Sequence, residues 1–158
     1  MKRILSVIVF LIVVAFSINA MAAGAIVITR DVSVSGVRVV EITATSDAAG
    51  APFADIALDS IPRSSGVPKM SFAGWWLFKI DSLFGATPVT ADSDLYIWST
   101  LDKIDILGAS GVDKVDDNTN KQIYPATATQ PLIGDEIFDV DNTTDNNAEH
   151  TFKLRLYR

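Results

Sequence analysis

The sequence contains no cysteine and only one histidine, His150. Without cysteine there are no disulfides, no thiolate metal ligands and no thiol catalysis. A serine nucleophile would depend on that one histidine as its base, and the G-x-S-x-G motif of a nucleophile elbow is absent. We therefore expect a non-catalytic protein with no catalytic, metal-binding or cofactor-binding residues, and we interpret His150 as a surface or strand-edge residue.

The chain also lacks an excess of positive charge. It has 13 Lys and Arg against 19 Asp and Glu, a formal net charge of −6. Nucleic-acid-binding proteins carry basic patches, and anionic lipid surfaces attract basic segments. The composition therefore predicts no nucleic-acid partner and no membrane partner for the mature chain, and it favours solubility. We expect a protein partner or self-association, for the reasons given below.

The only long hydrophobic run stands at the N-terminus. Two basic residues precede an apolar run over residues 4–16, and residues 20–22 form a small-x-small site. This pattern predicts a signal peptide over residues 1–22, cleaved after Ala22, and export to the periplasm or the exterior. Two alternatives stay open: an uncleaved anchor, although the run is shorter than the roughly 20 residues of a membrane span, and a true start at Met21.

Residues 23–158 consist of short alternating runs separated by turn signals, with no amphipathic helix. Alternation is clearest over residues 94–101 and over residues 151–158, where Phe152, Leu154 and Leu156 share one side. Regularly spaced short strands are typical of sandwiches and barrels. We predict an all-β single domain, an Ig-like or jelly-roll-like β-sandwich of about eight strands, preceded by a signal-peptide helix.

Two of the expected strands carry local detail. The apolar phase slips between Val39 and Val40, which predicts a β-bulge there. Residues 69–80 are apolar on both faces, which predicts a central strand followed by a loop over residues 81–92. On that strand we expect Trp76 and Phe78 in the core.

The last strand, residues 152–158, alternates between an apolar and a cationic side. The cationic side carries Lys153, Arg155 and Arg158 in a chain that is otherwise acidic. We expect an open sheet edge through which copies dock head to tail. The alternative is a strand paired inside its own sheet with its cations in solvent.

Acidic and amide residues gather between residues 135 and 147 and, less densely, between residues 113 and 118. Calcium prefers such oxygen ligands, but an EF-hand loop starting at Asp139 would need Gly and Glu where Thr144 and His150 stand. We interpret both stretches as solvated turns.

Aromatic residues are the other candidate for a ligand site. Seven of them could form a sugar-binding platform: Phe72, Trp75, Trp76, Phe78, Phe84, Tyr96 and Trp98. Because large aromatic side chains bury much apolar area, we expect most of them in the core. Any that stay exposed would mark a contact surface.

A series of short motifs resembles a known group of proteins. The stretch G-W-W-L-F at residues 74–78 is followed by G-A-T-P at 85–88, D-L-Y-I at 94–97 and D-I-L-G-A at 105–109. This order resembles small, mostly uncharacterised β-rich proteins encoded among the structural genes of tailed phages and prophages. The resemblance covers residues 25–158 and implies no catalytic residues.

Together these observations predict a virion-like structural or interaction protein, a decoration or tail- or head-associated component that docks on a larger assembly. It would be virion-associated if Met21 is the true start. The alternative is a secreted or periplasmic binding module for a cell-surface or glycan partner.

Overall fold

A computed structural model describes residues 24–46, 53–87, 89, 93–115, 119–126, 131–141 and 148–158. The predicted signal peptide and its helix, residues 1–22, lie outside this part. So do residues 116–118 and 142–147 of the two acidic stretches. The predictions for these segments therefore stay predictions.

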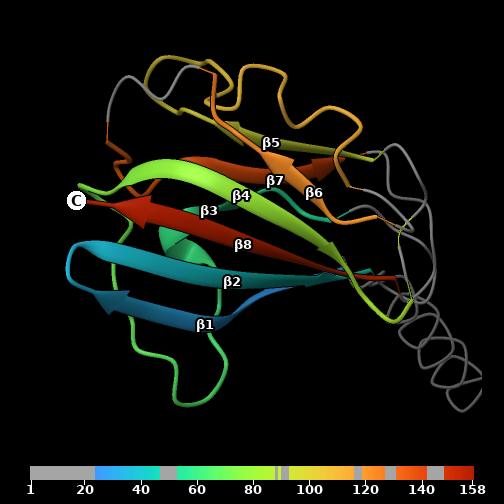
Figure 1. Cartoon of the computed structure of the whole chain (residues 1–158), viewed down its shortest axis with the longest axis horizontal. Helices are drawn as coiled ribbons and strands as arrows, with labels where there is room; N and C mark the ends of the chain where they lie inside the picture. Colours follow the sequence, from blue (N-terminus) through green and yellow to red (C-terminus); the bar gives the residue numbers. More distant parts are fainter. Residues whose placement is uncertain are drawn as a thin grey trace, which may run out of the picture.

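The described chain forms two antiparallel sheets (Figure 1). Its strands are β1 (Ala25–Val34), β2 (Val37–Thr45), β3 (Ile56–Ala57), β4 (Trp76–Phe84), β5 (Asp94–Trp98), β6 (Lys121–Ile123), β7 (Ile137–Asp141) and β8 (Glu149–Tyr157). One sheet has the order β1-β2-β8-β4-β6 and the other the order β3-β7-β5. The all-β prediction is confirmed, since the described part contains only one short 3-10 turn, η1 (Leu58–Ser60).

Inward side chains of both sheets meet in one hydrophobic core. Phe138 of β7 contacts Phe152 of β8 edge to face, with ring centroids 5.3 Å apart, and both rings are fully buried. The predicted alternation of the last strand is confirmed, because Phe152, Leu154 and Leu156 are all buried. The alternation predicted over residues 94–101 is present on β5, where Leu95 and Ile97 are the buried side.

The bulge predicted at Val39/Val40 is wrong. β2 pairs with β8 in one unbroken register from Val37 to Thr45. The apolar phase never slips, because the inward residue before Val40 is Arg38, which is fully buried. A register shift lies instead on β1, between Ile28 and Arg30.

The core positions predicted for Trp76 and Phe78 are also wrong. β4 begins at Trp76 and continues to Phe84, into the segment predicted to be a loop. Its register against β8 shifts between Leu77 and Lys79, so Phe78 is an extra residue and is 56% exposed. Because of this shift, Leu77 is buried and Trp76 faces outward. Uniform alternation would have placed Trp76 and Phe78 on the inner side together with Ile80.

β8 is not an edge strand. It lies between β2 and β4 and pairs with both over nearly its whole length (Figure 1). Its backbone groups are used inside the sheet, so it cannot pair with another chain as predicted. The edges of this sheet are β1 and β6.

The remaining described segments contain little strand. Residues 53–61 contain only β3 and η1, and residues 132–140 form a strand only from Ile137. Residues 104–107 form an isolated bridge and a turn. β6 is only three residues long.

Candidate functional site

A row of apolar side chains crosses the outer face of the five-stranded sheet. Val34 lies opposite Val37, Val37 opposite Tyr157, and Tyr157 opposite Trp76. Directly opposed residues of antiparallel strands share a face and touch. Val34 is 66% exposed, and Trp76 stacks on Tyr157 with ring centroids 6.2 Å apart. We call these four residues the apolar row.

The bulge extends the apolar surface toward β6. The exposed Phe78 ring meets the exposed Tyr124 ring edge to face, with centroids 6.3 Å apart. The Tyr124 hydroxyl donates to Gln122 Oε1 at 3.0 Å, which places Tyr124 on the same side of β6 as Gln122. Exposed apolar surface continuous over several strands marks a contact surface.

Two carboxylates on the same face as the apolar row are each shared by two cations. Glu41 Oε1 lies 3.3 Å from Arg30 Nη1 and 3.1 Å from Lys153 Nζ. These side chains come from β1, β2 and β8, whose register places them in one cross-strand row. Each exposed pair contributes little stability, so their main effect is the surface charge.

The second shared carboxylate is Asp81. Its Oδ1 lies 2.8 Å from Lys79 Nζ, and its Oδ2 accepts from Arg155 Nε at 2.9 Å. Burial raises the pKa of Asp81, but the hydrogen bonds and charges of Lys79 and Arg155 outweigh it and hold the pKa below its usual value. A shallow depression of about 310 Å³ opens between these side chains.

Four cations against two carboxylates leave a positive surplus on this part of the surface. The chain as a whole has a net charge of −6. We call the outer face of the five-stranded sheet, with the apolar row and these four cations, the basic face.

The outer face of the three-stranded sheet has the opposite charge. Asp94 lies opposite Asp141, and Tyr96 opposite Asp139, while Asp55 continues the chain just before β3. None of the three strands contains Lys or Arg. We call this surface, with Trp98, the acidic face.

Aromatic rings and carboxylates alternate on the acidic face. Tyr96 and Trp98 stack with centroids 5.3 Å apart, and Trp98 Nε1 donates to Asp139 Oδ2 at 3.1 Å. Burial, together with the nearby Asp55 and Asp141, raises the pKa of Asp139 to about 6 despite that hydrogen bond. Burial, with Asp94 alongside, also raises the pKa of Tyr96.

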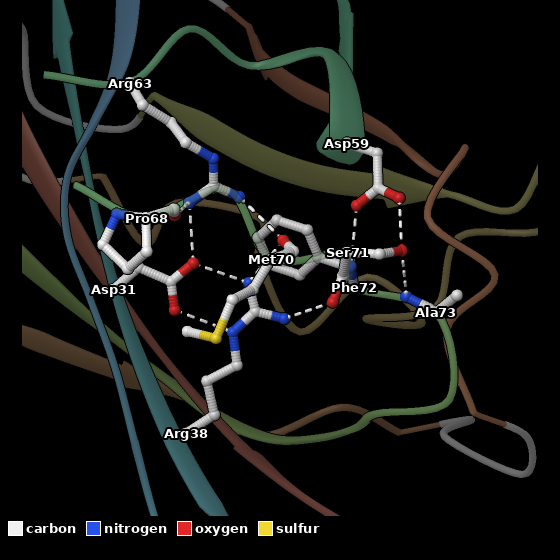
Figure 2. Close-up of polar contacts among 9 residues, drawn as sticks. All are labelled: Asp31, Arg38, Asp59, Arg63, Pro68, Met70, Ser71, Phe72 and Ala73. Carbon is white, nitrogen blue, oxygen red and sulfur yellow. Dashed lines mark hydrogen bonds and ion pairs between the residues drawn. The ribbon is translucent and has the colours of Figure 1, made fainter.

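A buried ion network lies beneath one end of the basic face (Figure 2). Arg38 donates from Nε and Nη2 to the two oxygens of Asp31, at 2.8 and 2.7 Å. Arg63 Nη1 reaches the same carboxylate at 2.7 Å. Both guanidinium groups also donate to the Met70 carbonyl, and Arg38 donates to the Ser71 carbonyl.

This network fixes the loop that leads into β4. The Arg38 guanidinium lies over the Phe72 ring, 4.6 Å from its centroid. Asp59 Oδ1 accepts from the Phe72 backbone N–H at 2.7 Å, and its other oxygen accepts from the Ser71 hydroxyl (Figure 2). Because the loop is held from both sides, Trp76 enters β4 in a fixed orientation.

This network was not predicted, although the sequence carries a signal for it. Arg38 has the same period-two phase as Val40, Ile42 and Ala44, all of which are fully buried. If a charged residue is allowed on the inner side, the alternation of residues 38–44 places Arg38 there.

The prediction that His150 is a surface or edge residue is wrong. His150 is fully buried, and its Nε2 lies 2.7 Å from Ser82 Oγ. The Ser82 hydroxyl donates to the Lys114 carbonyl at 2.8 Å, so it accepts from His150. With both side chains out of reach of solvent, this serine–histidine pair acts as a link within the core.

The other predicted site residues are divided between core and surface. Phe72 and Trp75 are buried, whereas Phe78, Phe84 and Trp98 are exposed. Glu136, from the acidic stretch, accepts from the backbone N–H groups of Ile133 and Gly134. Over the described residues, no group of three or more His, Cys, Asp or Glu is placed to hold a metal ion.

The chain matches no known family model, and no curated protein and no solved structure is significantly similar to it. The resemblance to phage structural proteins therefore stays a prediction. Within the described part of the chain, no helix has the length and apolar character needed to cross a membrane.

Proposed function

We propose that this chain is a non-catalytic β-sandwich protein that docks on a larger protein assembly through its basic face. The apolar row is the observation that carries this proposal. The phage-like motifs favour a virion-like component, associated with the head or the tail. Export through the predicted signal peptide, or a start at Met21, would decide where that assembly forms.

The outer side of an antiparallel sheet is normally polar when it faces water. Here four apolar side chains from four strands form one row, and Trp76 and Tyr157 stack within it. Aromatic side chains each bury large areas at interfaces and are enriched there. Since the sheet already holds them in place, binding costs little ordering entropy.

The shape of the basic face also favours a protein partner. The apolar row lies on a sheet surface, and the neighbouring depression is shallow and lined by charged groups such as Lys79 and Arg155. Small-molecule sites are concave and mostly apolar. A broad surface with apolar rings and flanking charges is suited to another protein surface.

The test is particle association in the source cells. Tagged wild-type chain and a Trp76→Ser/Tyr157→Ser variant would be separated on density gradients, and particles would be imaged with immunogold. We expect wild-type chain on large particles and the variant in the light fractions. Thr43→Ala, on the same face and away from the apolar row, is the matched control. Wild-type chain found only in light fractions would overturn the proposal.

A glycan-binding module is the second candidate, favoured by the acidic face. Sugar rings stack on exposed aromatic faces, and carboxylates accept their hydroxyl hydrogens. The Trp98 ring is exposed and lies beside Asp139, which supplies both features. A glycan array with wild-type and Trp98→Ala chains tests it, with binding expected for the wild type alone.

A further inference from the structure

We infer that the basic face of one copy of this chain docks on the acidic face of a second copy, so that copies associate head to tail. The inference rests on the proposed function, since it names a second copy as one partner of the basic face. It replaces the strand-edge docking that the central position of β8 excludes.

The two faces lie on opposite sides of the molecule. One is the outer side of the five-stranded sheet and the other the outer side of the three-stranded sheet, and the shared core lies between them (Figure 1). One copy can therefore use both faces at once. A contact between two different faces is heterologous, and it produces a ring or an open filament.

Charge complementarity identifies the partner. The outward positions of the basic face carry four cations against three carboxylates, Glu41, Asp81 and Glu149, which leaves a positive surplus. On the acidic face Asp139 and Asp141 of β7 lie at outward positions beside Asp55, whereas Asp94 of β5 is buried, and these strands contain no cation. Two acidic faces would repel one another, whereas a basic and an acidic face attract and steer each other into register.

Both faces also present aromatic rings. Trp76, Tyr157 and Phe78 lie on the basic face, and Tyr96 and Trp98 on the acidic face. Arginine stacks well on such rings, and Arg30 is available for this because its side chain is 60% exposed. The contact would therefore combine apolar burial with opposite charges.

The experiment uses two charge-reversed chains. The first, Lys153→Glu/Arg155→Glu, has two acidic faces. The second, Asp55→Lys/Asp141→Lys, has two basic faces. Sedimentation velocity would be run on each chain alone, on their mixture and on the wild type, at about 0.01 M and about 1 M ionic strength, where the Debye length is about 30 Å and about 3 Å. Circular dichroism would confirm that both variants fold.

We expect the wild type to associate at low salt and to dissociate at high salt. Each variant alone should associate at least about tenfold more weakly, and the mixture should regain association. A wild type that is monomeric at low salt, or folded variants that stay monomeric when mixed, would overturn the inference. Either result leaves the proposed function intact, because particle association is measured separately and through the apolar row.

Discussion

Arg38 is a fully buried cation whose donors are taken up by a carboxylate and two carbonyl groups. Such a group is costly to bury and is retained only when its partners are complete. Asp31 is also buried, and its negative charge is balanced by Arg38 and Arg63.

We expect Arg38→Met to lower the free energy of unfolding by about 3–5 kcal/mol, because Asp31 loses its bidentate partner. Urea denaturation followed by tryptophan fluorescence measures this loss. Arg30→Met is the control: it removes an exposed pair with Glu41 and should cost less than about 1 kcal/mol. Equal losses for the two variants would contradict the structural role of the network.

Asp139 is a second single residue whose effect on stability can be tested, because that effect depends on pH. Its pKa is about 6 in the folded chain and 3.8 in the absence of the fold. The folded state therefore binds the proton more tightly, and this contribution to stability is lost as the pH rises from about 4 to 6.

We expect Asp139→Asn to raise the free energy of unfolding at pH 7 by about 1 kcal/mol, after allowance for solvent screening at a partly exposed site. The asparagine still accepts from Trp98 Nε1 and no longer repels Asp55 and Asp141. The gain should disappear below about pH 4. Thermal unfolding at both pH values checks this, and a gain that does not change with pH would disprove the assigned cause.

At the scale of single elements, the bulge in β4 decides which aromatic and aliphatic side chains reach the core. Leu77→Ala should cost about 2–5 kcal/mol because Leu77 is buried. Phe78→Ala should cost less than about 1 kcal/mol because the ring is largely exposed. Chemical denaturation of the two variants side by side tests the register. A larger loss for Phe78→Ala than for Leu77→Ala would place the bulge elsewhere.

The features of single elements that could be predicted from the sequence are those with a local signal. The alternation of residues 152–157 predicted which side of β8 is buried. It could not predict that β8 is central, because centre and edge strands alternate alike and pairing depends on distant residues. The apolar row was missed for the same reason, since Val34, Trp76 and Tyr157 meet only through the register of four strands.

At the scale of the whole molecule, composition and turn spacing were enough to predict an all-β domain. The two oppositely charged faces were not predictable, because they arise from which strands share a sheet. Of the predicted basic stripe, Lys153 and Arg155 do face outward, on a sheet face shared with Arg30 of β1 and Lys79 of β4, whereas the Arg158 guanidinium lies over the Trp75 ring instead.

The fate of the N-terminal segment is a prediction for the whole chain. We expect chain recovered from an extracytoplasmic fraction to begin at residue 23, because residues 20–22 have the small-x-small pattern of a cleavage site. Intact mass spectrometry measures this directly. A product starting at Met21 in the cytoplasm, or an uncut chain in membranes, would contradict export by a cleaved leader.

The central position of β8 has a consequence for biosynthesis. Both neighbours of β8 precede it in the sequence, and β2 pairs with it across more than a hundred residues. Until β8 has been synthesised, β2 and β4 have no strand between them, so the five-stranded sheet cannot close. Such non-local pairing makes folding late and slow. Before β8 emerges the nascent chain therefore lacks its larger sheet, and an incompletely folded polypeptide can still be threaded through a translocation channel.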